Sequence, residues 1–366
     1  MGISENKRNS SFEILRIILM IMITLHHMTL DYGIESKNVF INTCAQFFTI
    51  GGKVGVNVFV LIGAYFLCEK TFSSKRLVKL YSQIWEYSFL ALALALIFAR
   101  ELVTIKTVFR SIFPITFSGY WFVTAYFGML LLTGIMNVII EKLTYLEHSI
   151  LILVGLLLLT IIPTFTAQTP FNSNIAWFIL LYFIGAHLRK YNSVVKQKLS
   201  NGWIFIGMWL FIFSTSIIMI VAGKKLSFLN EGINFFSGMY ILPQIIGCVS
   251  LLLWFEKKSI QNKFINKISL LGKYTFACYL IQSNCMWVYK RSAFNKWLWT
   301  VLPNYLYPFV IVVLALGFCF VAMGIDAVRV KLEKLIRIDR AQVYVANGID
   351  KCLIRIKNMI IQGENK

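Results

Sequence analysis

The chain has 366 residues, of which 58% are hydrophobic and only 14% are charged, and its mean hydropathy is +0.71. Soluble domains are about 45–50% apolar and roughly 25% charged, so this composition excludes an ordinary soluble core and indicates lipid as the surrounding solvent. The net charge of +20 does not indicate nucleic acid, because the charges lie in short clusters between apolar segments.

Ten apolar segments are candidates for helices that cross the hydrocarbon, which takes about 20 residues. They are residues 12–30, 53–68, 83–99, 120–140, 149–166, 172–188, 203–222, 239–255, 268–288 and 305–327. The predicted fold is therefore all-α, a polytopic membrane helix bundle of about ten transmembrane helices. The first segment is longer than a signal h-region and lacks a small-residue cleavage site, so we expect it to be retained.

Lysine and arginine set the orientation of such a bundle. With the N-terminus in the cytoplasm, 24 of the 36 basic residues fall in segments assigned to the inside and 9 in segments assigned to the outside. An even number of spans then places both termini in the cytoplasm. The predicted organisation is a cytoplasmic tail at 1–11, a membrane domain at 12–327 and a basic cytoplasmic tail at 328–366.

The C-terminal tail repeats apolar residues at helical spacing while its basic residues lie off that stripe. The stripe consists of Ile349, Cys352, Leu353, Ile356, Met359 and Ile360. This pattern predicts a basic amphipathic helix on the inner leaflet of the membrane, and a helix that binds a partner protein is the alternative.

The seven cysteines form no CxxC pair and mostly lie in apolar segments, so they are expected to act as small buried hydrophobes and not as metal ligands. The chain also contains no G-x-S-x-G, Walker A, HExxH or GxGxxG motif. Serine hydrolase, ATPase, zinc protease and Rossmann chemistries therefore gain no support.

Ionisable groups concentrate in the first predicted span, where each is costly and therefore a functional candidate. Eleven helical steps separate Arg16 from His27, which places them about 20° apart on one face and roughly 16 Å apart along the axis. Glu13 can pair with Arg16 one turn away, whereas His26 points to another face. The alternative is that Glu13 and Arg16 reach the inner interface while both histidines lie at the outer one.

Three polar residues follow in the second span and the segment after it. Asn57 places an amide in the bilayer, where it can bind substrate or join helices. Arg76 and Lys79 lie one turn apart in a basic loop that suits lipid headgroups or the phosphates of a soluble cofactor. A plain positive-inside signal explains the two cations equally well.

Three further candidates lie in later spans. Trp121 and Tyr126 open the fourth span and Gln282 lies towards the outer end of the ninth. They can line a substrate site, but an aromatic belt and hydrogen bonds between helices are the alternatives.

Five segments together resemble the acyltransferase-3 family. NSSFEILRIILMIMITLHHM carries the acidic residue, arginine and histidine of its first helix as Glu13, Arg16 and His27. GVNVFVLIGAYFL, KRLVKLYSQIW, YWFVTAY and GKYTFACYLIQ are similar to its second helix, first cytoplasmic loop and two later signatures, in family order. The chain departs from the family at Gly63, where serine is common, at Lys79, where a second arginine is usual, and at Gln282, where histidine is frequent.

The resemblance implies a membrane O-acyltransferase that moves an acyl group, usually acetyl, from cytoplasmic acetyl-CoA to a hydroxyl of an extracytoplasmic or lipid-linked glycan. His27, Arg16 and Glu13 would be catalytic, Arg76 and Lys79 would hold CoA phosphates, and Asn57, Trp121, Tyr126 and Gln282 would contact substrate. His27 would act as general base or form an acyl-histidine. No tightly bound cofactor, metal or nucleic acid is implied, and the expected location is the cell membrane.

Two alternatives come from other functional classes. A transporter or flippase for a polysaccharide unit also needs many helices, but it predicts broken spans in matched halves of the chain. A membrane sensor on the same scaffold would bind ligand without catalysis. Transfer from labelled acetyl-CoA would separate the three.

Overall fold

The computed structural model describes residues 9–117, 119–260 and 262–364, and no strand occurs among them. The first half contains α1 (Ser10–Asp31), α2 (Val39–Leu67), α3 (Ser74–Phe98), α4 (Ile105–Ile112), α5 (Trp121–Lys142), α6 (Tyr145–Leu156), a π-helical turn (Leu157–Ile161), α7 (Ile162–Thr166) and α8 (Asn174–Lys190). The second half contains α9 (Val194–Leu199), α10 (Gly202–Gly223), α11 (Leu242–Glu256), α12 (Lys263–Ser269), α13 (Thr275–Gln282), α14 (Trp287–Val301), α15 (Tyr307–Leu335) and α16 (Ile338–Glu364). The all-helical prediction is confirmed.

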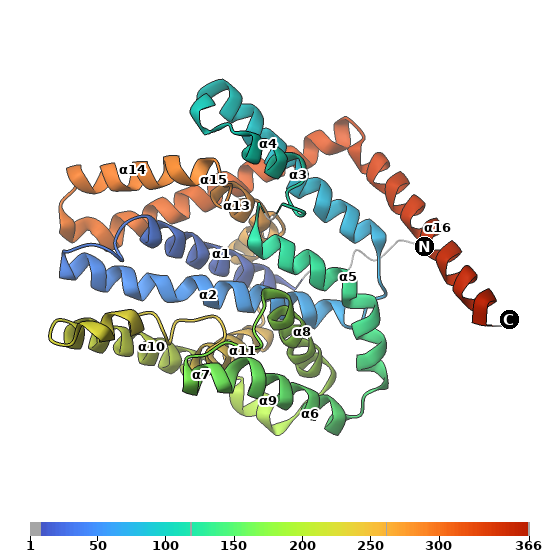
Figure 1. Ribbon diagram of the computed structural model, residues 1–366, viewed down its shortest axis with the longest axis horizontal. Helices are drawn as coiled ribbons and strands as arrows, with labels where there is room; N and C mark the ends of the chain where they lie inside the picture. Colours follow the sequence, from blue (N-terminus) through green and yellow to red (C-terminus); the bar gives the residue numbers. More distant parts are fainter. Residues whose placement is uncertain (1–8, 118, 261, 365–366) are drawn as a thin grey trace.

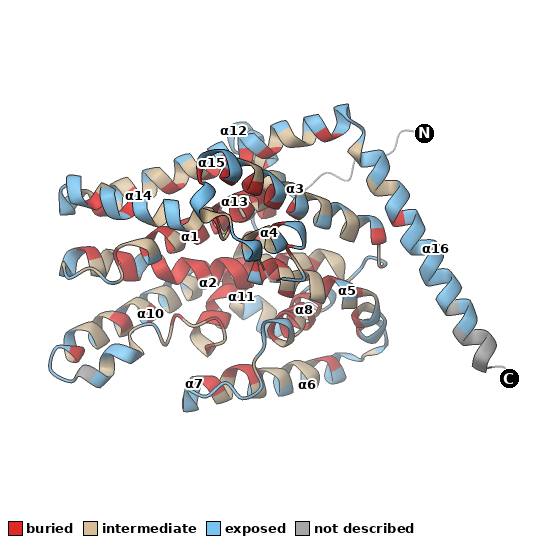
Figure 2. Cartoon of the chain, turned by 45° about the horizontal axis from the view of Figure 1, so that its top comes forward, coloured by how far each residue is buried: buried red, intermediate tan, exposed pale blue. Residues whose placement is uncertain are grey.

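The first two helices form the centre of the bundle, with their axes close to the long axis of the molecule (Figure 1). They approach closely because glycines of α2 face α1: a Cβ on Gly52 would lie 2.2 Å from the His26 ring, and one on Gly55 would lie 2.4 Å from Ile23. Buried residues concentrate in α1, α2, α8 and α11 (Figure 2). The outer helices α3, α6 and α10 expose large apolar side chains, as lipid-facing helices do.

Seven helical segments among the described residues are long and apolar enough to cross a membrane: Ser10–Asp31, Val39–Leu67, Ser74–Phe98, Trp121–Lys142, Tyr145–Thr166, Gly202–Gly223 and Asn304–Leu335. The chain is therefore a multi-pass membrane protein. Of the other predicted spans, α8 has 17 residues and α11 has 15. The count of ten and the cytoplasmic position of the termini stay predictions.

The expectation of one continuous ninth span over 268–288 is wrong. That stretch is divided among the end of α12, a 3-10 segment (Leu270–Tyr274), α13 and the start of α14. Gly272 lies so close to α1 that a Cβ there would meet Glu13 Oε2 at 2.5 Å. At the other break, Asn284 Oδ1 accepts a hydrogen bond from the Met286 amide, a local contact that competes with helix.

Two helices begin earlier than the apolar segments predict. The side chain of Asn38 accepts from the Ile41 amide and starts α2 at Val39, so Lys53 lies in mid-helix instead of at the edge of a span. The basic segment that follows α2 was expected as a loop, but it forms the first turns of α3. Hydropathy alone misses such ends because amphipathic turns extend a spanning helix beyond its apolar part.

Segments that the charge count places on one side of the membrane also meet at one end of the bundle. At the predicted inner end, Ser11 donates to the Lys258 carbonyl, and Arg189 pairs with Glu69. At the predicted outer end, Lys290 of α14 pairs with Glu101, which follows α3. These contacts join segments that the charge count assigns to the same side of the membrane.

The C-terminal segment forms the predicted helix as α16, which projects from the bundle and forms the right-hand edge of Figure 1. Its apolar stripe is uncovered, since Ile349, Leu353, Ile356 and Met359 are each at least 40% exposed. Residues 1–8 of the predicted N-terminal tail and the side chain of Ile360 lie outside the described residues.

Candidate functional site

The polar stripe of the first span lies on α1 as a single 22-residue helix. Asn9 caps its start by accepting from the Ser11 amide. Because the helix is unbroken between Arg16 and His27, their separation of about 16 Å along the axis follows from its rise per residue. The two residues therefore belong to different depths of the bundle, and each lies in a polar group of its own.

The inner cluster consists of Glu13, Arg16, Arg76 and Tyr126. Arg16 Nη1 donates to Glu13 Oε1 at 2.5 Å, and the arginine side chain keeps 26% exposure while the glutamate keeps 6%. The charges of Arg16 and Arg76 both act on the Tyr126 side chain. Three helices, α1, α3 and α5, thus place two guanidinium groups within electrostatic range of one phenol.

The absence of a side chain at Gly63 leaves room for this phenol, since a Cβ there would lie 2.8 Å from the Tyr126 hydroxyl. Arg76 is half-buried and Lys79, one turn further along α3, is exposed. Within the described residues, neither cation has an ion-pair partner. Both charges are available to an anionic ligand.

The outer cluster consists of His26, His27, Lys53 and Arg291. His26 is buried against α2, and its Nδ1 lies 2.8 Å from the Thr49 carbonyl oxygen. His27 is half-buried, its ring lies 5.4 Å from the His26 ring, and no described residue forms a hydrogen bond with it. The two neighbouring histidines therefore differ: His26 is held between helices, and both ring nitrogens of His27 are available.

Two cations act electrostatically on His27, namely Lys53 of α2 and Arg291 of α14. Arg291 is neutralised by a two-point contact with Asp31, at 2.6 and 3.0 Å, and it also donates to the Gln282 carbonyl. Lys53 has no hydrogen-bond or ion-pair partner within the described chain, although its ammonium lies 5.6 Å from the centre of the Trp121 ring. A cation without an ionic partner in mid-helix is costly in a membrane, and this makes Lys53 a candidate for function.

The family comparison agrees with this arrangement. The acyltransferase-3 family model, described as an acyltransferase domain, matches residues 9–324, which is nearly the whole chain. The chain belongs to this family. No curated protein and no solved structure matches it. The protein is therefore a membrane acyltransferase, and the resemblance inferred from five segments is confirmed.

Two predicted substrate contacts of the acyltransferase have partners inside the protein. Asn57 is fully buried, donates to the Met239 carbonyl at 3.0 Å and accepts from Trp177 Nε1 at 2.8 Å. These two contacts join α2 to α8 and to the turn that precedes α11. Gln282 is buried with Nε2 near the Met20 sulfur, and its Oε1 has no partner among the described residues.

The structure adds residues to the site that sequence reasoning did not include. Lys53 was placed at the start of the second predicted span and Arg291 in a segment outside the membrane, and Asp31 was not singled out. The signal for Lys53 was present, since a lysine followed within four residues by Asn57 in an otherwise apolar segment interrupts a span. The contact between Asp31 and Arg291 joins positions 260 residues apart and had no local signal.

Proposed function

We propose that this acyltransferase moves an acyl group, acetyl in the simplest case, from cytoplasmic acyl-CoA to a hydroxyl of an extracytoplasmic or lipid-linked glycan. The observation that carries the proposal is that Arg16 and His27 lie on one uninterrupted helix, each within a separate basic cluster. A cytoplasmic donor and a surface acceptor also make the cell membrane the expected location.

The inner cluster supplies donor binding in this proposal. Coenzyme A carries phosphates, and guanidinium groups bind phosphates at two points. Arg76 and Lys79 would hold these phosphates, while Arg16, kept in place by Glu13, would line the entry of the pantetheine arm. Tyr126, whose hydroxyl lies against Gly63, would border this entry. The thioester would then extend along α1 towards His27.

His27 supplies the proton transfer. One imidazole nitrogen takes the proton from the acceptor hydroxyl as its oxygen attacks the thioester carbonyl carbon, and the carbon–sulfur bond breaks. The imidazolium then returns the proton to the departing thiolate, so the products are the ester and free CoA. An acyl-histidine formed first on the same nitrogen leads to the same products in two steps. Lys53 would stabilise the negative charge that develops on the carbonyl oxygen.

The acceptor would reach the outer cluster from the extracytoplasmic face of the membrane. Trp121 is 36% exposed beside the Lys53 ammonium, which makes its ring a platform on which a sugar ring can rest. Gln282 and the outer end of α1 would complete this side of the site. Asn57 would shape it indirectly, by holding α2 against Trp177 of α8.

Transfer from radiolabelled acetyl-CoA to glycan, measured with the purified protein in liposomes, tests the proposal. The His27→Ala variant should lose about 10²–10⁴-fold of the rate while its amount in the membrane stays normal. The matched control is His26→Ala, which removes the contact with Thr49 and a buried ring; we expect a lower melting temperature but retained turnover of the folded enzyme. A transporter or sensor would leave the label on CoA, and a fully active His27→Ala enzyme would return this residue to a structural role.

A further inference from the structure

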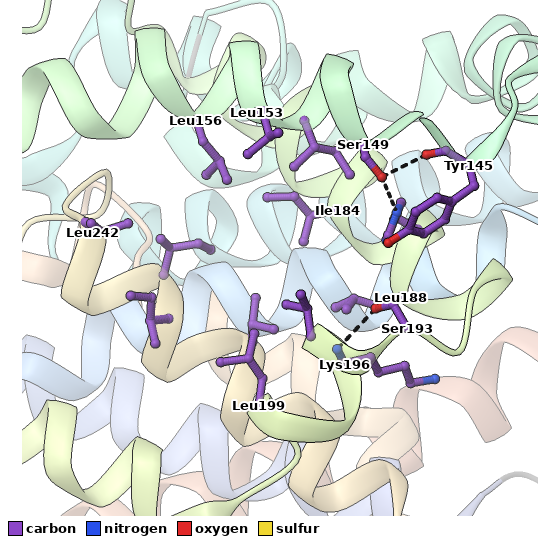
Figure 3. Close-up of a pocket in the computed structure, with 16 residues that line it drawn as sticks. Tyr145, Ser149, Leu153, Leu156, Ile184, Leu188, Ser193, Lys196, Leu199 and Leu242 are labelled. Carbon is purple, nitrogen blue, oxygen red and sulfur yellow. Dashed lines mark hydrogen bonds between the residues drawn. The ribbon is translucent and has the colours of Figure 1, made fainter. Parts of the chain in front are cut away.

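A cavity of about 380 Å³ lies away from both clusters, between α6, α8, α9 and α11. None of the predicted site residues lines it. One end of its lining is polar, with Tyr145, Ser149, Ser193 and Lys196, and the other end is apolar, with Leu156 and Leu242 (Figure 3). Tyr145 and Leu156 stand eleven residues apart on α6, so the cavity runs about 16 Å along the helix axis.

The polar end lies at the inner end of the bundle, where the positive-inside rule places the cytoplasm. Ser149 Oγ lies 3.1 Å from His187 Nε2 at this end, and it donates to the Tyr145 carbonyl at 2.7 Å. The short helix α9 carries Val194 and Val195, which are 65% and 62% exposed, next to lysines. Such a helix is suited to lie in the plane of the headgroups.

The sequence around the polar end of the cavity is rich in cations, and one of them, Lys196, lines the cavity itself. The sequence has no acidic residue between Glu147 and Glu231, and four cations follow one another at Arg189, Lys190, Lys196 and Lys198. Arg189 is neutralised by Glu69 and Lys196 by Glu256. Lys190 donates to two backbone carbonyls, at 2.8 and 3.2 Å. Neither Lys190 nor Lys198 has an ion-pair partner in the described chain.

The polar end is also joined to the core of the protein. Lys196 Nζ and the Tyr65 hydroxyl both donate to Glu256 Oε1, at 2.8 and 2.5 Å. Arg189, which holds Glu69 by two bonds of 2.9 and 3.0 Å, stacks its guanidinium over the Tyr65 ring. This chain of contacts joins α9 to α2, α8 and α11 at the polar end of the cavity.

We propose that this cavity is a binding site for one anionic phospholipid of the inner leaflet. An acyl chain occupies the apolar length between α6 and α11, and the phosphate lies at the polar end beside Ser193 and Lys196, where Lys198 of the same short helix α9 supplies the uncompensated charge. The length of the cavity, its polarity gradient and the uncompensated positive charge all suit a lipid with a negative headgroup. The site is separate from the proposed transfer path, so its test does not depend on catalysis.

Native mass spectrometry of the full-length protein, delipidated in detergent and titrated with phosphatidylglycerol, measures the binding directly. One saturable adduct is expected, with weaker binding of phosphatidylcholine that carries the same chains. Leu153→Trp, which fills the cavity from an exposed position, should weaken binding about tenfold or more because the indole takes the space of the acyl chain. Lys198→Gln should weaken phosphatidylglycerol alone, by about fivefold.

The matched control is Leu146→Trp, which lies on the same helix at 65% exposure, against 63% for Leu153, but does not line the cavity. If Leu153→Trp does not fold, Leu156→Trp at the apolar end replaces it. The proposal is overturned by equal binding in wild type and the cavity variant, by equal loss in the control, or by equal affinity for phosphatidylcholine. Stronger binding of undecaprenyl phosphate would assign the cavity to a glycan-carrier lipid instead.

Discussion

At the scale of single residues, the two neighbouring histidines of α1 show how position decides a role. His26 is held by the Thr49 carbonyl and by contact with Gly52, whereas His27 has both ring nitrogens available and lies near two cations. The sequence could indicate His27 because its spacing from Arg16 fixes a shared helix face. It could not indicate the partners of His27, because Lys53 and Arg291 come from other helices.

Lys53 provides a prediction at this scale. Lys53→Gln should lower the rate of acyl transfer about 10²-fold, because the charge that stabilises the developing oxyanion is lost. Lys53→Arg keeps the charge and should retain a large part of the rate. The measurement is kcat for both variants in liposomes, alongside the melting temperature. A similar kcat for Lys53→Gln and the wild type would contradict a role in catalysis. The contact with the Trp121 ring would then be the remaining role of Lys53.

At the scale of elements, Asn57 joins three parts of the fold that are distant in sequence. Asn57→Ala should remove two buried hydrogen bonds and leave Trp177 Nε1 and the Met239 carbonyl unpaired, at a cost of about 1–3 kcal/mol for each group. We therefore expect a clearly lower melting temperature with an unchanged KM for acyl-CoA. A raised KM at normal stability would speak for substrate contact instead.

Helix α3 carries the second prediction at this scale. Arg76→Gln combined with Lys79→Gln should raise the KM for acyl-CoA and leave kcat nearly constant, because phosphate contacts contribute equally to ground state and transition state. Lys75→Gln in the same turn is the matched control, since it removes an exposed charge outside the predicted pair. A fall in kcat without change in KM would contradict donor binding at this helix.

The helices themselves were largely predictable, since hydropathy located every long apolar segment. Their ends were less so: α2 begins at Val39 and α3 at Ser74 because polar and amphipathic turns continue both helices. The break around Gly272 depends on its close approach to Glu13, a contact that no local pattern contains. Local periodicity therefore finds helices, and tertiary contacts decide where they stop.

At the scale of the whole molecule, the distribution of charge and the fold agree. The segments richer in lysine and arginine gather at one end of the bundle, together with Arg76 and Lys79, and the histidines of α1 lie towards the other end. The family match adds the reaction class. The central claim of the proposed function is the direction of transfer, from the cytoplasmic face to the outer one.

Sealed inside-out vesicles test that claim most directly. With labelled acetyl-CoA in the bath and the native glycan acceptor enclosed in the lumen, the account predicts label on the enclosed glycan. Right-side-out vesicles with acetyl-CoA in the bath should give none, and the His27→Ala protein should give none in either orientation. Labelling that occurs only when donor and acceptor are on the same face of the membrane would contradict transfer along α1 from Arg16 to His27.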